Sequence, residues 1–186
     1  MNLYLYILIG VVALLLLITI IYFNRFVSYR NRIKNAWSDI DVQLKRRYSL
    51  IPNLVDSVKG YALYEKGLFE NVAKYRSQAE SASGVKEQQG AENNLVAAMK
   101  NVLMVVENYP ELLANQNFMK LQDSLIDVED TLQNARRYYN ALVRDNNTAV
   151  QSFPGNLFAG MFGFRAADFF EIENIEKEVI KVDINT

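Results

Sequence analysis

An apolar run near the start of the chain, Leu3 to Phe23, constrains the fold more than any other feature. Its 21 residues include no charged side chain, and only Gly10 and Thr19 interrupt a series of aliphatic and aromatic residues. An α-helix rises about 1.5 Å per residue, so a helix of this length spans roughly 30 Å, the thickness of the hydrocarbon core of a bilayer. Residues 1–23 are therefore predicted to form a single transmembrane helix.

A cleaved signal peptide is the main alternative for such a run. Signal peptides have a basic segment in front, an apolar core of about 7–15 residues and a cleavage site of small residues. Here only Met1 and Asn2 precede the run, the run is longer, and Tyr22-Phe23-Asn24-Arg25 lacks small residues. The chain has no Cys, so attachment through a lipidated cysteine is also excluded. We expect a retained, single-pass anchor in the cell membrane.

Basic residues cluster directly after the apolar run. Residues 24–48 carry seven basic side chains against two acidic ones, a net charge of +5, whereas the whole chain has a net charge of −1. The membrane-proximal basic flank consists of Arg25, Arg30, Arg32 and Lys34. Because Lys and Arg near a membrane helix favour the cytoplasmic side, the pattern predicts an N-terminus outside and a cytoplasmic C-terminal domain. The flank is also suited to contact with anionic headgroups.

Beyond the anchor, apolar residues keep a coiled-coil spacing of alternating three and four residues, broken only by Arg30, Arg47 and Glu65. The positions are Phe26, Ile33, Trp37, Ile40, Leu44, Ile51, Leu54, Val58, Tyr61, Leu68, Val72, Tyr75 and Ala79. This spacing predicts a long helix that buries one stripe. Pro52 predicts a kink or short break near Leu50-Ile51, with Ser49 able to cap a restart. No helix breaker follows Phe23, so the anchor is predicted to continue into the bundle.

Turn signals divide the rest of the chain. The small and polar residues from Ser81 to Gly90 predict the first turn. A shorter helix around residues 95–106 ends before Pro110, because the residue before a proline is driven out of helical geometry. Core-spaced residues from Phe118 to Ala149 predict the last long helix, which closes at Phe153-Pro154-Gly155. Residues 24–155 are expected to form one helical bundle.

Residues 156–172 are rich in Phe and Gly, and residues 173–186 form an acidic tail. The phenylalanines that are candidates for membrane or partner contact are Phe158, Phe162, Phe164, Phe169 and Phe170. One interpretation is a short helix whose phenylalanines cap one end of the bundle; the other is an element that touches lipid or another subunit. In the tail, residues 179–182 predict either a short strand or a frayed end.

The composition excludes several kinds of chemistry. The chain has no His and no Cys, which removes Ser-His-Asp and Cys-His catalysis, thiol redox chemistry and the usual zinc and haem sites. A di-iron site in a bundle would need Glu-x-x-His pairs, and no glycine-rich phosphate loop is found. Lys45-Arg46-Arg47 could bind nucleic acid, but its closeness to the anchor favours membrane or protein contact. We expect no enzyme activity, no cofactor, no metal and no nucleic-acid partner.

Polar residues occupy positions where the helical stripes favour apolar ones. The candidates for buried, register-setting roles are Arg47, Glu65, Glu129, Arg136 and Asn146. Long cations can reach solvent from such positions; the alternative is that they pair inside the bundle and fix its register. Our hypothesis is that Arg47 and Glu65 take partners on the helix from Phe118 to Ala149, with Glu129 and Arg136 as the obvious choices. On that pairing, replacing Arg47 by Met is expected to destabilise the protein little or even to stabilise it, whereas a loss of several kcal/mol would show that a buried partner had been stranded.

Several sequence blocks together resemble the LemA family. The longest is AWSDIDVQLKRR at residues 36–47, followed by LIPNLV at 50–55 and VKGY at 58–61. Further matches are YPEL at residues 109–112, Asn117-Phe118, Arg136 with Tyr139-Asn140, Phe153-Pro154 and Phe169-Phe170-Glu171. The resemblance implies an N-terminally anchored bacterial membrane protein whose soluble part is an antiparallel four-helix bundle. It implies no enzyme activity, because the family has no established biochemical function.

The sequence therefore predicts an all-α protein, in which a single transmembrane helix continues into a bundle that ends in a short Phe-rich element. The leading hypothesis for function is a non-catalytic, self-associating scaffold of the bacterial cell envelope, since a helix leaving the membrane with many core-spaced positions can bury some of them against neighbouring copies. Its expected partners are the lipid bilayer, further copies of the chain and membrane proteins of unknown identity. The alternative is a membrane-tethered sensor that binds a small ligand or a lipid in its bundle.

Overall fold

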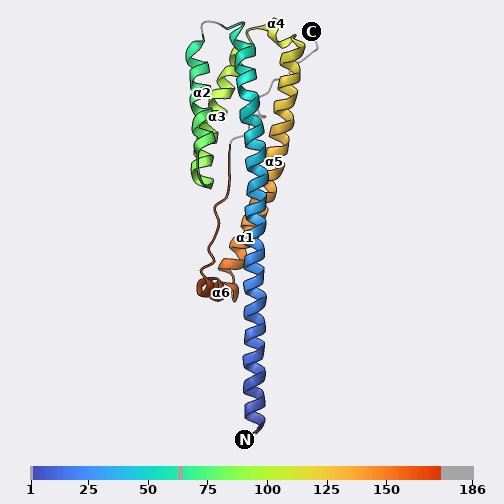
Figure 1. Cartoon of the computed structure of the whole chain (residues 1–186), viewed down its shortest axis with the longest axis vertical. Helices are drawn as coiled ribbons and strands as arrows, with labels where there is room; N and C mark the ends of the chain where they lie inside the picture. Colours follow the sequence, from blue (N-terminus) through green and yellow to red (C-terminus); the bar gives the residue numbers. More distant parts are fainter. Residues whose placement is uncertain (1, 63–64, 173–186) are drawn as a thin grey trace. The chain divides into compact units, whose positions relative to one another are not determined.

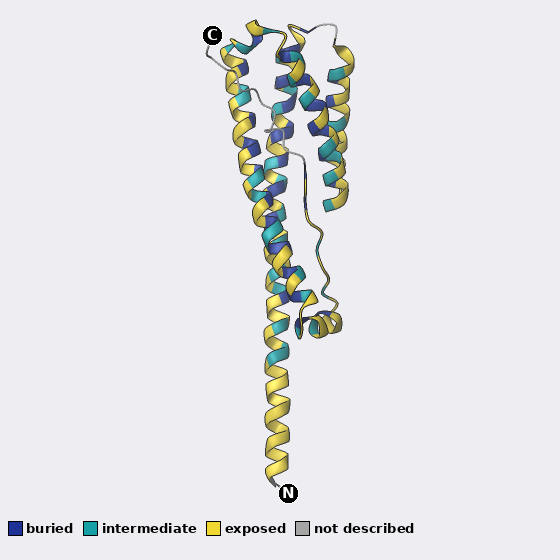
Figure 2. Cartoon of the chain, turned by 180° about the vertical axis from the view of Figure 1, so that it is seen from behind, coloured by how far each residue is buried: buried dark blue, intermediate teal, exposed yellow. Residues whose placement is uncertain are grey.

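A computed structural model describes residues 2–62 and 65–172, and in that part of the chain all regular secondary structure is α-helical. The first helix, α1, runs from Asn2 to Lys59 without interruption. Its N-terminal third is exposed, as the yellow segment of Figure 2 shows. Within the described residues, α1 is the one helix long and apolar enough to cross a membrane. This suggests a membrane anchor, as the apolar run predicts.

Five helices follow α1 in the described chain (Figure 1). They are α2 (Lys66–Ser81), α3 (Val85–Val106), the single turn α4 (Pro110–Leu113), α5 (Gln116–Gln151) and α6 (Gly155–Phe162). Local chemistry fixes several of their ends. Pro110 opens α4, where its missing N–H costs nothing. The Asn115 side chain accepts hydrogen bonds from the N–H groups of Asn117 (2.9 Å) and Phe118 (3.3 Å) and so caps α5.

The chain divides into two compact units. We call Met1–Ser38 with Tyr138–Phe169 the anchor unit, and Asp39–Arg137 with Phe170–Thr186 the bundle unit. The two long helices α1 and α5 each contribute residues to both units.

The bundle unit is built from the C-terminal part of α1, from α2 and α3, and from the N-terminal part of α5, with successive helices antiparallel (Figure 1). Each helix carries buried residues, which are dark blue in Figure 2. The core consists chiefly of Ile40, Leu44, Ile51, Leu54 and Val58 from α1, Phe69, Val72 and Ala79 from α2, Leu95, Met99 and Val102 from α3, and Phe118, Val128 and Leu132 from α5. Burying each of the larger side chains contributes about 1.5–3 kcal/mol.

The anchor unit is held by α1, the end of α5 and α6. Its core is the buried cluster of Phe26, Ala149 and Ala159, one from each of these helices. At the start of α6, a Cβ on Gly155 would clash with the Ala149 carbonyl, so glycine permits the close approach of α6 to α5. At its end, Gly163 adopts the left-handed conformation (φ +72°) that stops the helix.

Two predicted helix boundaries are wrong. The chain stays helical through Pro52, and Ser49 does not cap a restart, because its hydroxyl donates to the Arg46 carbonyl (2.7 Å). Buried neighbours on both sides of the proline, Ile51 and Leu54 among them, hold the helix despite the lost hydrogen bond. Conversely, the stripe expected to run to Ala79 is broken where α1 ends at Lys59, which Gly60 follows.

The turn predicted from Ser81 to Gly90 is shorter than expected. It occupies only residues 82–84, so Gly90 lies inside α3 and that helix begins ten residues before Leu95. The acidic tail 173–186, including the strand considered at 179–182, lies outside the described residues.

Candidate functional site

The centre of the bundle unit is a buried charge, Arg47. It stands on α1 at a position that continues the apolar stripe, and its side chain is fully buried (0% exposed). Two carboxyl groups surround it: Glu92 of α3, also 0% exposed, and Glu129 of α5, 9% exposed. A salt bridge joins Arg47 Nη2 to Glu92, and Arg47 Nη1 donates to Glu129 Oε1 at 2.9 Å. One guanidinium therefore connects three helices.

Two polar side chains extend this cluster on the Glu92 side. The Tyr48 hydroxyl donates to Glu92 Oε1 and accepts a hydrogen bond from Gln88 Nε2 (2.9 Å). Gln88 Nε2 also lies 2.9 Å from Glu92 Oε1 and 3.1 Å from the Ala79 carbonyl oxygen, which links α3 to the end of α2. We call Arg47, Tyr48, Gln88, Glu92 and Glu129 the buried network.

The buried network is expected to determine register more than stability. Desolvating charged groups offsets much of their mutual attraction, so a buried salt bridge contributes little net stability, whereas stranding one partner is costly. A helix shifted by one turn would leave Arg47 or a carboxyl group unpaired. Burial also raises the pKa of Tyr48 from 10.0 to about 12, so its hydroxyl keeps its proton to a higher pH than that of an exposed tyrosine.

A cavity of about 310 Å³ adjoins the network. Tyr48 and Gln88 line it from the network side, while Asp41, Lys45 and Glu80 supply charged groups. Lys45 Nζ and Asp41 Oδ2 form an exposed salt bridge of 2.7 Å at this cavity. The lining is polar and of both signs, so it suits a small zwitterionic or polar molecule better than an apolar one.

Four of the five residues predicted to set the register are buried, and the fifth, Glu65, is exposed. The structure buries Arg47, Glu129, Arg136 and Asn146 and brings Arg47 and Glu129 together. Glu65 is exposed in the connection before α2, so the expectation that it is buried in the bundle is wrong. The reason is the break after Lys59, which takes residue 65 out of the stripe. Arg136 instead donates to the Ile172 carbonyl oxygen at 2.8 Å.

Asn146 serves a segment that the sequence did not associate with it. In the anchor unit its Nδ2 donates to the Arg165 carbonyl oxygen (3.2 Å). The adjacent Asn147 donates to the Ala167 carbonyl (2.9 Å) and accepts from the Ala167 N–H (2.8 Å), and Tyr139 donates to the Asp168 carbonyl (3.0 Å). Burial raises the pKa of Tyr139 to about 12, and the nearby Asp168 adds to the shift. Residues 165–168, which we call the strap, are thus fastened to α5.

The five candidate phenylalanines separate into two groups. Phe158, Phe162 and Phe164 pack on aromatic residues of α1 in the anchor unit, where Phe164 stacks on Phe26 with ring centroids 5.1 Å apart. Phe169 is 43% exposed, whereas Phe170 is completely buried in the bundle unit. Phe170 is therefore buried within the bundle unit, whereas the first three pack on Tyr22, Phe23 and Phe26 at the end of the apolar run.

The basic flank is exposed throughout: Arg25, Arg30, Arg32 and Lys34 all face away from the core. Arg25 donates to the Tyr29 hydroxyl (3.2 Å), which raises the pKa of its guanidinium. Arg30 lies over the Phe164 ring, 5.7 Å from its centroid, a cation–π distance.

Sequence reasoning missed Glu92, Tyr48, Gln88 and Asn147. Glu92 and Gln88 lie one turn apart on α3, before the first apolar residue that we used to trace that helix, so the start of the helix hid them. The helical spacing of three and then four residues, from Leu95 back to Glu92 and on to Gln88, could have revealed both. Among residues 2–62 and 65–172, no group of three or more acidic residues is arranged to hold a metal ion.

Comparison with known proteins places these features in context. A family model described as LemA family matches residues 36–184. The magnetosome protein MamQ 2 of Paramagnetospirillum magneticum is 24% identical, over 80% of this chain and 64% of that protein, so the chain spans less than two thirds of this relative. MamQ of Magnetospirillum gryphiswaldense is 24% identical over 87% of the chain and 70% of its own length. Protein LemA of Metamycoplasma hominis is 25% identical over 88% and 73%, respectively.

Proposed function

The chain belongs to the LemA family, and from this membership and its structure we propose that it is a non-catalytic, membrane-anchored interaction or scaffold protein of the bacterial cell envelope. The observation that carries the proposal is α1 itself. One helix, Asn2–Lys59, contains both the exposed apolar run and the buried residues of the bundle core. The polar side chains of the buried network are paired with one another inside the bundle.

We further propose that the N-terminus lies outside and the bundle unit in the cytoplasm. The support is the exposed basic flank directly after the apolar run. The Cys-free sequence allows a clean test with Ser124→Cys, an exposed position on α5. A membrane-impermeant maleimide should label this variant only after the cells are permeabilised. If the reagent labels cells whose outer barrier has been removed but whose cell membrane is intact, the bundle lies outside instead.

Self-association is part of the proposal, but the structure changes which surface would serve it. The α1 residues expected to bury themselves against neighbouring copies, such as Ile40, Leu44 and Ile51, are already buried within one chain. We propose that the exposed apolar side chains of residues 3–21 serve instead, because they are free to pack against copies inside the bilayer. A sharp monomer mass in nanodiscs, with no crosslinked species in membranes, would rule out self-association.

A sensor is the second candidate, and the cavity beside Tyr48 and Gln88 favours it. A ligand there would touch the buried network directly and could bias the packing of α1, α2 and α3. The test is thermal unfolding of the full chain against a panel of polar metabolites and lipids. A ligand at 100 times its Kd adds about 2.7 kcal/mol to the free energy of unfolding, and this gain should disappear in Lys45→Met if the cavity is the site.

A further inference from the structure

The short helix α6 packs against the residues that end the apolar run of α1. The Phe158 ring stacks on Tyr22 with centroids 5.0 Å apart, and Phe162 meets Phe23 edge-on at 5.1 Å. Both contacts lie within the anchor unit. If residues 3–23 cross the bilayer, as the proposed function requires, then α6 is held at the level where the chain leaves the hydrocarbon core.

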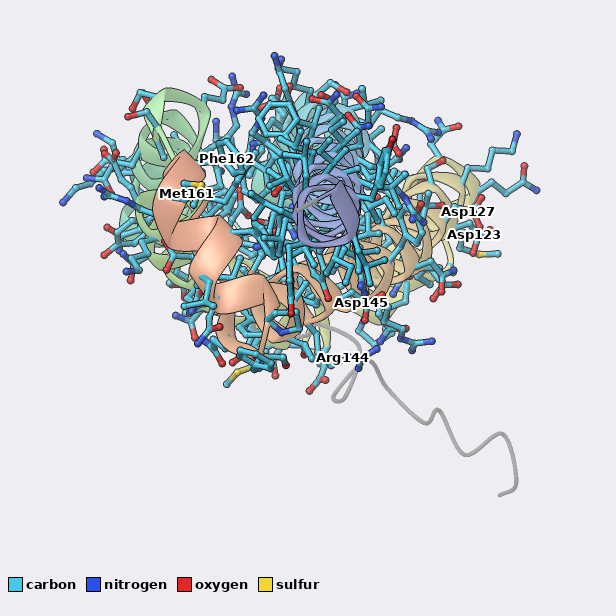
Figure 3. The ribbon with its side chains drawn as sticks, turned by 90° about the horizontal axis from the view of Figure 1, so that it is seen from below. Asp123, Asp127, Arg144, Asp145, Met161 and Phe162 are labelled. Carbon is cyan, nitrogen blue, oxygen red and sulfur yellow. The ribbon has the colours of Figure 1, made fainter. Side chains whose placement is uncertain are left out.

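The direction of α6 is suited to that level. In Figure 1 α6 is seen nearly end-on while α1 runs along the vertical, and in Figure 3 α1 is seen end-on while α6 runs across the picture. The two views agree that α6 crosses α1 at a steep angle. A helix that lies across a membrane-spanning helix lies along the plane of the membrane, as interfacial helices do.

The side of α6 that does not contact α1 is apolar and exposed. On α6, Leu157 and Met161 lie four residues apart and are 60% and 71% exposed, and Phe153, two residues before the helix begins, is 81% exposed. Met161 and Phe162 are visible on α6 in Figure 3, which looks from the side of the N-terminus of α1. No charged residue occurs from residue 153 to residue 164. A soluble protein rarely leaves such a continuous apolar surface in water.

We propose that α6 is a second membrane contact, an interfacial helix whose exposed Leu157 and Met161, together with Phe153 just before the helix, insert among the lipids around the exit of α1. Lipid is the occupant because this face continues the exposed apolar surface of the anchor, through Phe23 and Phe162. Cations border it as an anionic headgroup layer would require: Arg25 and Arg30 on α1, and Arg165 directly after α6. Such helices sit about 5–10 Å deep, at the boundary of headgroups and acyl chains.

The test uses the full chain in vesicles of phosphatidylethanolamine and phosphatidylglycerol. Single cysteines are introduced into the Cys-free sequence at Met161 (α6), Val12 (anchor) and Met119, and each is labelled with an environment-sensitive fluorophore. Met119→Cys is the matched control, because Met119 is an exposed methionine on α5 of the bundle unit (48% exposed). Quenchers carried on lipids just below the headgroups, and a water-soluble quencher, report the depth of each label.

We expect the label of Met161→Cys to emit at shorter wavelength than that of Met119→Cys and to lose most of its emission to the shallow lipid quencher. If it resembles Met119→Cys while Val12→Cys is quenched by lipid, the inference about α6 is wrong and the anchor stands. If Val12→Cys is also in water, the anchor itself fails, and α6 with it. A third result is a Met161→Cys label that is shielded from water but is not quenched by the lipid quencher. If the same label becomes exposed to water at one chain per nanodisc, a second copy of the chain covers α6, and this would overturn the inference.

Discussion

Replacing Arg47 by Met should destabilise the bundle unit strongly, contrary to the small cost expected from the sequence, because stranding a buried carboxyl group is costly. Arg47 and Glu92 are both 0% exposed and Glu129 is 9% exposed, so the substitution strands two buried carboxyl groups at once. Removing one member of a buried ion pair typically costs about 3–5 kcal/mol. A domain of this kind is stable by about 5–15 kcal/mol, so Arg47→Met should lose a large part of its stability.

The assay is urea unfolding of the full chain in mild detergent, followed by circular dichroism at 222 nm. The matched control is Lys45→Met, two residues away on α1, which removes the exposed salt bridge to Asp41 and should cost less than about 1 kcal/mol. A third variant, with Arg47→Met, Glu92→Leu and Glu129→Leu together, removes all three charges and should recover most of the loss.

Two results would refute this reasoning. Equal unfolding midpoints for Arg47→Met and Lys45→Met would show that the network is not buried as described. A triple variant less stable than Arg47→Met would show that the carboxyl groups do not depend on Arg47.

Three further predictions follow from the packing and the hydrogen bonds. Gly155→Ala should displace α6, because the added Cβ meets the Ala149 carbonyl, and should cost about 1–3 kcal/mol, whereas Gly160→Ala, with open space around it, should not. Asn147→Ala removes both hydrogen bonds to Ala167 and should lower the free energy that holds the strap on α5 by about 1–2 kcal/mol. Limited trypsin digestion measures the effects of Gly155→Ala and Asn147→Ala, because each variant should be cleaved faster after the exposed Arg165. The pKa of Tyr48 is about 12 in the folded protein against an ordinary 10.0, so between these values the folded protein keeps a proton that the unfolded chain loses. The free energy of unfolding should therefore fall as the pH rises from about 10 to 12. Urea midpoints measured across that range should fall less in Tyr48→Phe than in the unchanged protein.

The sequence was sufficient for the features that depend on local periodicity. The apolar run predicted the exposed N-terminal part of α1, and the spacing from Phe118 to Ala149 predicted α5, which runs from Gln116 to Gln151. Arg47 interrupts an otherwise apolar stripe, so it must meet a partner or reach solvent, and Glu129 on the helix from Phe118 to Ala149 was the partner expected for it.

The remaining features depend on contacts between segments that are distant in sequence. The strap is irregular, and its position comes from side-chain amides of Asn146 and Asn147 that bind backbone groups about 20 residues later, which no periodicity reveals. The helix α1 continues through Pro52, because the packing of buried residues on both sides stabilises it more than the one missing hydrogen bond destabilises it. The end of α1 had a local signal, Lys59-Gly60, but the apolar spacing continued past it and concealed the break.

The most direct test of the proposed function is chemical crosslinking of the full-length protein in native membranes, followed by mass spectrometry of the crosslinked peptides. If the chain is an interaction or scaffold protein, we expect abundant crosslinks between copies of the chain, or from the chain to other membrane proteins. If residues 3–21 form the contact, these crosslinks should be lost when the anchor is replaced by an unrelated membrane helix. Crosslinks confined to single chains, together with strong thermal stabilisation by one small ligand, would contradict the scaffold proposal and favour a sensor.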